Sequence, residues 1–289
     1  MLLNMKELLA VANERNFAVP AFNIGTNVIL KAVLECCEEK KAPVILAIHP
    51  FELAFQGDGF LQHCITAASK AKVPVTIHLD HGSELSQIYR AIRNGFTSVM
   101  IDASHESFED NVAICKKVVE IAHPLGISVE GELGTIGTVG NDAEGGSGVI
   151  IYTKPEDAAR FVEETGVDTL AIAIGTAHGI YPQGFKPELK LDLLKEIKAK
   201  VSIPLVLHGG SANPDAEIAE SVRMGINKIN ISSDIKDAFY QQLRLDLAAD
   251  PKLREPFELY LGSIREMKKA INQKIDLFND ADQARYYSL

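Results

Sequence analysis

Cysteine is scarce in this sequence, and the spacing of the few cysteines present matches no cross-linked framework. The chain has four, with no CxxC pair, and two of them are neighbours inside a segment of helical pattern. They are Cys36, Cys37, Cys64 and Cys115. Small secreted domains instead carry several cysteines at regular spacings. The sequence therefore predicts a protein without structural disulfides, located in a reducing compartment.

Long apolar runs are missing as well. A membrane-spanning helix needs roughly 18 or more consecutive apolar residues, and no run in the chain approaches that length. Residues 1–16 also lack the basic start, the sustained apolar stretch and the small-residue cleavage site of a secretory signal. We therefore expect a cytoplasmic protein that has no membrane partner.

An excess of positive charge is the third feature that the sequence lacks. Lys and Arg number 29 against 39 Asp and Glu, which gives a formal net charge of −10. Proteins that bind nucleic acids or anionic membranes neutralise phosphates with clustered Lys and Arg. We therefore exclude nucleic acid as a partner, and any phosphate bound here has to be held by local groups.

What the sequence does contain is a regular alternation of short β-rich runs and longer segments of helical period. The predicted strands are 19–24, 43–48, 73–79, 98–102, 127–133, 169–175, 203–209 and 228–231. Such alternation is typical of a parallel sheet. No linker divides the chain, and no glycine-rich fingerprint follows the first strand, so we favour one (β/α)8 TIM barrel domain over residues 1–289 to an open doubly wound sheet. Residues 260–278 predict an additional C-terminal helix.

Three histidines share an unusual context. His81, His178 and His208 each end an apolar run and each precede a glycine, in TIHLDHG, AIAIGTAHG and IPLVLHGGS. Taken singly, each is better explained as a polar residue that finishes a strand. The C-terminal ends of barrel strands converge on one rim, however, where residues far apart in sequence can meet around one ion. Three imidazoles with an open position are typical of a catalytic site for Zn²⁺ or a related divalent ion.

Two carboxylates and a fourth histidine are further candidates for this site. Glu132, at the end of the fifth predicted strand, is either a further metal ligand or a carboxylate that orients a ligand. Asp80 directly precedes His81, and we favour a catalytic role for it over the orientation of a neighbouring imidazole. His78 is more often a packed interior group than a part of such a site.

Two loops rich in small residues predict an anion site. Gly209, Gly210 and Ser211 follow the seventh predicted strand, whereas Asn230, Ile231, Ser232 and Ser233 follow the eighth and precede a helical segment. Barrels frequently bind phosphate at these two loops through backbone N–H groups, hydroxyls and a helix N-terminus. A plain helix cap at NISSD is the alternative, and the two roles are compatible.

Together, the motifs VPAFNIGT, LDHG, SVMIDASH, VEGELG, DTLAIAIGTAHGIY, PLVLHGGS and KINISSD resemble class II, metal-dependent fructose- or tagatose-bisphosphate aldolases over essentially the whole chain. The resemblance implies retro-aldol cleavage of a phosphorylated ketose to dihydroxyacetone phosphate and an aldehyde. It implies that His81, His178 and His208 bind zinc and that Asp80 is the acid/base. The residues implied to bind substrate are Asn23, Gly179, Gly209–Ser211 and Asn230–Ser233. A Na⁺ or K⁺ ion beside the phosphate and a homodimer or homotetramer are implied as well.

Two departures from the family pattern bear on the mechanism and on the substrate. The family's C3-protonating glutamate follows the VEGELG strand on a mobile loop, and its position falls near Gly140 here. If the glycine-rich loop 134–148 is shifted, Asp142 or Glu144 can substitute. His49 stands where relatives carry a small hydroxyl residue or glycine near the sugar hydroxyls. It is either a substrate-binding residue that changes the accepted sugar or a rim histidine that points into solvent. For a distal phosphate, Arg265 is a weak candidate.

Three other functions remain alternatives. A metallohydrolase on the same fold normally carries a bridging lysine or a His-x-His after the first strand, and neither is present. A Schiff-base aldolase is disfavoured because the sixth predicted strand has no lysine, and Lys228 starts the eighth strand, away from the rim. A class II-like aldolase for another phosphorylated ketose or deoxy-sugar acid, or a non-catalytic sugar-phosphate binder, is compatible with the altered loop.

Overall fold

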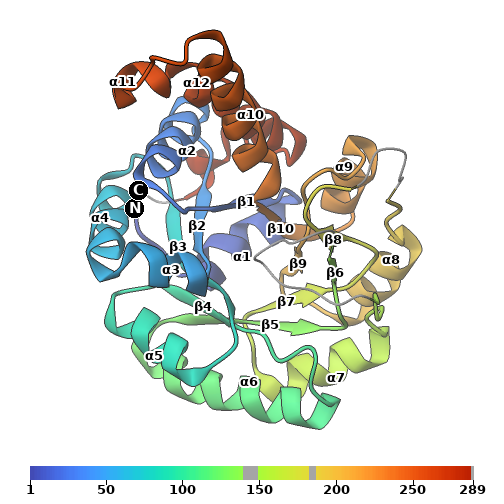
Figure 1. Cartoon of the computed structure of the whole chain (residues 1–289). Helices are drawn as coiled ribbons and strands as arrows, with labels where there is room; N and C mark the ends of the chain where they lie inside the picture. The colour runs from blue at the N-terminus through green and yellow to red at the C-terminus, as the bar shows by residue number, and fades with distance from the viewer. Residues whose placement is uncertain (139–148, 182–186, 288–289) are drawn as a thin grey trace.

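A computed structural model describes residues 1–138, 149–181 and 187–287, and it contains a closed barrel of eight parallel strands in these ranges (Figure 1). Around the barrel the order is β1-β10-β9-β7-β5-β4-β3-β2. The strands are β1 Val19–Asn23, β2 Val44–Ile48, β3 Val75–Gly82, β4 Ser98–Ile101, β5 Ser128–Leu133, β7 Thr169–Ile172, β9 Leu205–Leu207 and β10 Ile226–Ile231. The predicted (β/α)8 barrel is thus confirmed.

Alternation along each strand decides which side chains enter the barrel. Successive strand residues point to opposite faces, and the buried apolar residues accordingly divide into two clusters. The larger one lies between barrel and helices and includes Phe22, Leu46 and Leu79. The smaller one includes Val19 and Ala21 inside the barrel. The same alternation turns the polar residues of β3, β5 and β10 inward.

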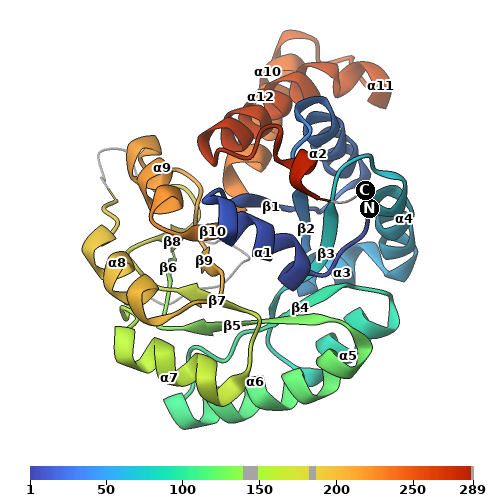
Figure 2. The ribbon, with the colours of Figure 1, turned by 180° about the vertical axis from the view of Figure 1, so that it is seen from behind.

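Helices pack around the barrel and across one of its ends (Figures 1 and 2). They are α1 Met5–Arg15, α2 Asn27–Lys40, α3 Pro50–Gln56, α4 Asp58–Lys70, α5 Leu85–Arg93, α6 Phe108–Ala122, α7 Pro155–Thr165, α8 Leu191–Lys200 and α9 Asp215–Arg223. The first of these differs from the rest, because α1 lies in front of the barrel in the reverse view of Figure 2. Met5, Leu8 and Leu9 of α1 belong to the cluster inside the barrel, so α1 closes the end of the barrel at which the strands begin.

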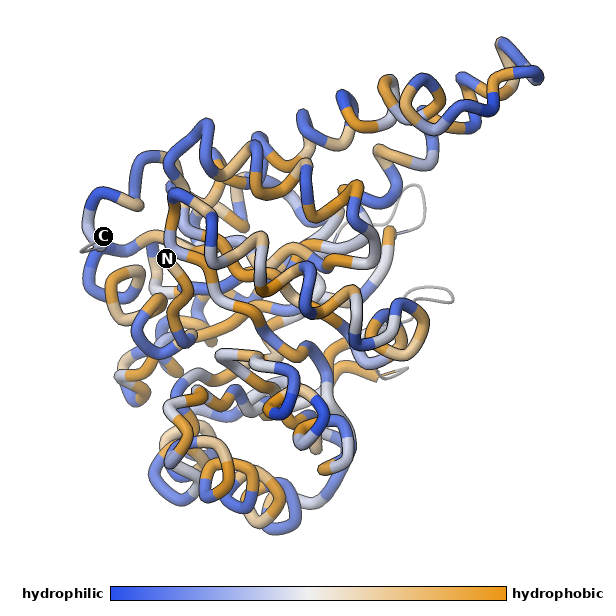
Figure 3. Tube along the Cα trace, turned by 90° about the vertical axis from the view of Figure 1, so that its left-hand side faces the viewer, coloured by the Kyte–Doolittle hydropathy of each residue, from blue (hydrophilic) through white to orange (hydrophobic). Residues whose placement is uncertain are grey.

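The C-terminal part of the chain forms a helical arm, comprising α10 Ser233–Ala249, α11 Pro256–Leu259 and α12 Leu261–Leu277. Helix α12 confirms the additional helix predicted at 260–278. It packs against α10 and α2, and Figure 3 shows α10 and α12 side by side as they project from the barrel. The projecting end exposes apolar side chains, with Phe257 70% and Leu261 63% exposed.

The observed strands are shorter than the predicted ones at several ends, and one difference bears on the site. Strand β7 ends at Ile172, whereas the prediction continued to residue 175. His178 therefore does not end a barrel strand. It lies on the short strand β8 Ala177–His178, which pairs with β6 Gly137–Thr138 above the barrel. Among the described residues, no helix is both long and apolar enough to span a bilayer.

Candidate metal centre and active site

The end of β3 has an irregular backbone that aims two neighbouring side chains at the site. The register between β3 and β4 shifts between Leu79 and Gly82, so β3 holds one more residue than β4 over this stretch. His81 lies in this bulge with φ of 51°, in the left-handed region that non-glycine residues rarely adopt. Bulges re-aim side chains next to active sites. Here the bulge allows consecutive residues, Asp80 and His81, both to be buried at the rim.

The three histidines predicted to bind a metal come together. The ring centroid of His81 lies 5.0 Å from that of His178 and 4.5 Å from that of His208. One nitrogen from each ring lies within 4.8 Å of one nitrogen from each of the others. His81, His178 and Glu132 also line a cavity of about 170 Å³. This spacing is compatible with three nitrogen ligands about 2.0–2.1 Å from one ion.

Polar atoms without partners show where an ion fits. In the described part of the chain, His81 Nε2, His208 Nδ1 and Glu132 Oε2 are buried and form no hydrogen bond. His208 Nδ1 and Glu132 Oε2 lie 3.2 Å apart, but their geometry is not that of a hydrogen bond. Buried groups normally find partners, because desolvation without one is costly. Two imidazole nitrogens and a carboxylate oxygen facing one space therefore suit a divalent cation.

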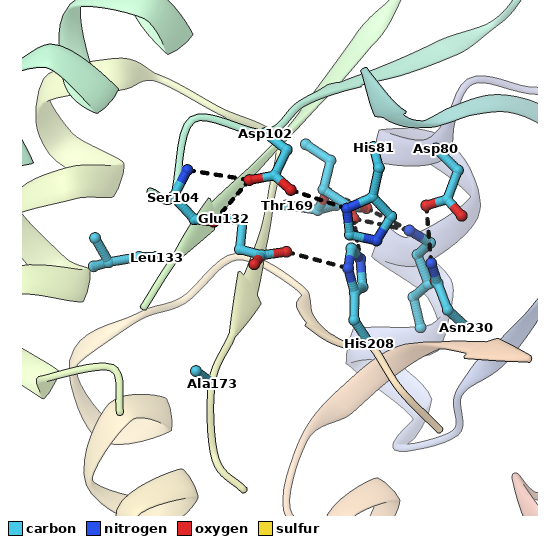
Figure 4. A network of polar contacts seen from close by, with 12 residues as sticks. Asp80, His81, Asp102, Ser104, Glu132, Leu133, Thr169, Ala173, His208 and Asn230 are labelled. Atoms are coloured by element: carbon cyan, nitrogen blue, oxygen red, sulfur yellow. Dashed lines mark hydrogen bonds and ion pairs between the residues drawn. The ribbon is translucent and has the colours of Figure 1, made fainter. Parts of the chain in front are cut away.

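Asp102 is a member of this site that the sequence analysis missed. His81 Nδ1 donates to Asp102 Oδ2 at 3.0 Å, and Asp102 Oδ1 accepts from both the amide and the hydroxyl of Ser104 (Figure 4). Burial acts to lower the pKa of His81, but the Asp80 and Asp102 carboxylates outweigh it and raise this pKa to about 10. Asp102 also forms a second candidate metal group with His81 and Glu132. The sequence signals for Asp102 were its position at the end of a predicted strand and its place in the motif SVMIDASH.

Asp80 is fixed by two amide side chains. Asn23 Nδ2 donates to Asp80 Oδ2 at 2.8 Å, and Asn230 Nδ2 donates to Asp80 Oδ1 at 2.9 Å. Burial acts to raise the pKa of Asp80, but the nearby His81, Lys228 and His208 cations outweigh it and hold this pKa well below its usual range. The carboxylate is thus kept ionised and oriented, as a proton acceptor needs to be.

The two loops predicted to bind an anion lie against each other. The Ala212 amide donates to Asp234 Oδ1 at 3.2 Å, and the Asp234 amide donates to Ser211 Oγ at 3.3 Å. Asp234 belongs to the first turn of α10, so the helix N-terminus lies at this junction. The Gly210 amide already donates to the Asn230 carbonyl at 3.2 Å, which leaves it less suited to an anion.

Glycine is required at the first of these loops. A Cβ atom at Gly210 would lie 2.4 Å from Ile229 Cγ2 and 2.8 Å from the Asn230 carbonyl oxygen. Gly209 has φ of 61°, and a Cβ there would lie 2.6 Å from the Ala177 carbonyl oxygen. Gly179, next to His178, has φ of 96°. These glycines therefore let the chain bring β8, β9 and β10 close together at the rim.

His49 lies at the rim but does not point into solvent. It is 8% exposed, and its ring centroid is 6.3 Å from that of His81. Its Nδ1 accepts from the Phe51 amide at 3.2 Å and so caps helix α3. Arg265, by contrast, is exposed on α12 and pairs with Glu266. Asp142 and Glu144 lie outside the described residues.

Comparisons with known proteins agree with this geometry. Residues 3–283 match the family model described as fructose-bisphosphate aldolase class-II. A probable fructose-bisphosphate aldolase of Bacillus subtilis is 41% identical over 98% of this chain and 99% of its own length. A fructose-bisphosphate aldolase of Thermus caldophilus is 38% identical over 98% of this chain and 100% of its own.

Solved structures of aldolases also match this chain over nearly its whole length. The YdjI aldolase from Escherichia coli K12 superposes with a TM-score of 0.84 and 33% identity, covering 97% of this chain and 98% of its own. A putative fructose-1,6-bisphosphate aldolase from Coccidioides immitis superposes with a TM-score of 0.88 and 27% identity, covering 98% and 99%. From the barrel, the site and these matches together, the chain belongs to the class II fructose-bisphosphate aldolases, a family of metal-dependent carbon–carbon lyases.

Proposed function

We propose that this chain is a zinc-dependent aldolase that cleaves a phosphorylated ketose, of the fructose or tagatose 1,6-bisphosphate type, to dihydroxyacetone phosphate and an aldehyde. The observation that carries the proposal is the juxtaposition at one rim of a three-histidine cluster and a fixed, ionised carboxylate, Asp80. We also propose that residues 1–289 form one domain and that the protein is cytoplasmic.

The metal would be held by His81, His178 and His208, with Glu132 as a further or alternate ligand. Unpartnered atoms on three of these four side chains support the assignment within the described ranges. A divalent ion supplies Lewis acidity, which stabilises the negative charge that develops on the ketose oxygens when a carbon–carbon bond breaks. Asp102 fixes the ring of His81 by accepting from its other nitrogen.

Asp80 would take the proton of the C4 hydroxyl in cleavage and return it in condensation. Asn23 and Asn230 were expected to bind substrate, and their contacts add a second role, because both orient Asp80. Their Oδ1 atoms are buried and have no hydrogen-bond partner in the part of the chain that the structure describes. These oxygens are suited to accept from substrate hydroxyls while Asp80 accepts the proton.

The phosphate of dihydroxyacetone phosphate would lie at the junction of the two small-residue loops. The contacting segments are Gly179, Gly209–Ser211 and Asn230–Ser233, including Gly210, Ile231 and Ser232. The support is the junction itself, which places the N-terminus of α10 beside Ser211. A Na⁺ or K⁺ ion at this phosphate is part of the proposal. His49 would contact the sugar hydroxyls, since its ring lies near that of His81.

Two further parts of the proposal rest on other regions. Protonation of C3 would come from Asp142 or Glu144 in the loop 134–148. The protein would be a homodimer or homotetramer, and the apolar side chains exposed on the arm, Phe257 and Leu261 among them, support this assembly. Contiguous exposed apolar surface commonly marks a protein interface.

An assay of retro-aldol cleavage with and without a chelator tests the proposal. Fructose, tagatose and related ketose phosphates serve as substrates, and released dihydroxyacetone phosphate is measured. We expect activity that disappears on metal removal and returns with Zn²⁺. Activity that survives complete metal removal, or that borohydride abolishes by trapping substrate on a lysine, would refute the metal mechanism. Binding of these sugars without turnover would identify a sugar-phosphate binder instead.

A further inference from the structure

A second polar cluster lies inside the barrel, below the histidines of the rim. Lys228 on β10 and Glu130 on β5 are both fully buried, and Lys228 Nζ lies 2.8 Å from each oxygen of Glu130. Glu130 precedes Glu132 by two residues, and Lys228 precedes Asn230 by two, so each points inward one layer deeper than its neighbour. TIM barrel interiors are filled mainly by branched apolar side chains. A buried ion pair at this depth is therefore unusual and indicates a specific role.

The cluster reaches the rim through one side chain. Glu130 Oε1 lies 2.8 Å from His208 Nε2. An ionised carboxylate only accepts hydrogen bonds, so the proton of His208 has to be on Nε2. In the neutral ring that a metal ligand requires, the other nitrogen, Nδ1, presents its lone pair. It is this atom that faces Glu132 (Figure 4) and forms no hydrogen bond within residues 1–138, 149–181 and 187–287. Glu130 thus fixes both the tautomer and the direction of the ring.

Lys228 supplies the positive charge that compensates the buried carboxylate of Glu130. A buried carboxylate alone would be strongly destabilising. The Lys228 ammonium lies 2.8 Å from both Glu130 oxygens and so compensates the carboxylate charge directly. The ammonium also lies 3.3 Å from His78 Nε2, and His78 Nδ1 lies 2.8 Å from Ser98 Oγ. Each polar group of the cluster is therefore satisfied.

We propose that Lys228 and Glu130 are positioning residues of the metal centre, which hold His208 with Nδ1 toward His81 and His178. The proposal rests on the proposed metal site and goes further, because it assigns a function to the lysine that the aldolase mechanism does not use. Carboxylates behind metal-ligating histidines raise ligand basicity and orient the ring, and their loss typically weakens metal binding 10–100-fold.

A double variant separates positioning from simple structural pairing. Glu130→Gln with Lys228→Met removes both charges together, so no unpaired charge stays buried. Thr169→Val is the matched control, because Thr169 Oγ1 makes a 3.4 Å contact with Glu130 Oε2 but none with His208. The dissociation constant for Zn²⁺ is measured by competition with a chromophoric chelator, and thermal unfolding of the metal-free proteins is measured beside it.

We expect the double variant to bind Zn²⁺ about 10–100-fold more weakly than the wild type and the control to bind normally. A double variant that unfolds at lower temperature but binds Zn²⁺ as tightly as the wild type would overturn the proposal and leave a structural ion pair. Failure of the metal site itself is a different result, since the wild type would then bind no stoichiometric metal.

A measurement on the wild-type protein keeps the test independent of variant folding. With ¹⁵N-labelled histidine and bound ¹¹³Cd²⁺, long-range ¹H–¹⁵N correlation spectra report which ring nitrogen of each histidine carries the proton. We expect His208 to carry it on Nε2 and to show cadmium coupling at Nδ1. A metal-loaded protein with the His208 proton on Nδ1 would contradict the positioning role.

Discussion

Two layers of polar side chains lie within the same barrel, and they differ in how completely they are paired. The upper layer, at the rim, contains His81, His208 and Glu132, each with an atom that has no hydrogen-bond partner among the described residues. The lower layer contains Lys228 and Glu130. Their polar atoms all lie within hydrogen-bonding distance of each other, of His208 or of His78. Both layers are buried to a similar degree.

The difference separates groups that await a ligand from groups that support them. Unpaired buried polar atoms cost free energy, so several of them converging on one cavity indicate a site that an ion or substrate completes. A fully paired cluster has no free donor or acceptor for a ligand, so it can only hold the neighbouring side chains in place.

Replacement of a rim histidine is expected to have the largest effect. His178→Ala removes one of the three nitrogen ligands, and turnover should fall by about 10³-fold or more, since Lewis-acid stabilisation is worth several kcal/mol. Turnover and bound zinc are measured together. His63→Ala, an exposed histidine paired with Asn27, is the control and should change neither. A His178→Ala enzyme with normal zinc content would remove this residue from the ligand set.

Replacement of the Asp80 carboxylate at the rim should separate chemistry from metal binding. Asp80→Ala is expected to keep its zinc and to lose about 10²-fold or more in turnover, because a positioned general acid/base contributes that much. Steady-state kinetics with metal analysis checks this. If the variant turns over at the wild-type rate, the acid/base assignment is wrong, and loss of zinc would instead place Asp80 among the groups that build the metal site.

The pH dependence of zinc affinity tests whether the unpaired groups at the rim bind an ion. Burial lowers the pKa of His81, but Asp80 and Asp102 outweigh it and raise this pKa to about 10 without a metal. Zinc therefore has to displace a proton, and its affinity should rise about tenfold per pH unit for each proton displaced. Chelator competition between pH 6 and 8 measures the slope. An affinity that does not change with pH would mean that His81 does not bind the ion.

Asp280 tests this distinction, because its carboxyl group is buried and unpaired among the described residues although it follows α12 and not a barrel strand. Neither carboxyl oxygen has a hydrogen-bond partner within the described ranges, and burial raises its pKa well above the usual value. The folded protein therefore retains this proton. Its contribution to stability is complete below the unfolded pKa of about 3.9 and is lost as pH rises through the raised folded pKa.

Asp280→Asn should accordingly raise the free energy of unfolding by about 1 kcal/mol or more at pH 8 and by less at pH 5. Zinc affinity should stay unchanged if unpaired atoms indicate a ligand only where they converge on a cavity. Denaturant unfolding at the two pH values checks the stability. Asp276→Asn, an exposed carboxylate paired with Lys40, is the control, and a change within about 0.5 kcal/mol is expected there. Equal stabilisation at both pH values would contradict the raised pKa.

The sequence by itself determined the barrel and most of the rim. Strand-like runs alternating with helical ones are a local property, so eight βα units were readable without contacts. The rule that parallel strands end on one rim then brought His81 and His208 together, although they lie far apart in sequence. Small residues in NISSD and HGGS likewise marked the two loops that meet at Ser211 and Asp234.

Only the tertiary structure decided how these side chains are paired. The bulge that turns both Asp80 and His81 to the site depends on the register with β4, and His178 lies on a short strand above the barrel rather than at a strand end. The Lys228–Glu130–His208 contacts join three strands, β10, β5 and the end of β9, across the interior. Local patterns carry no information on such contacts, since each depends on barrel closure and on the depth at which a side chain enters the interior.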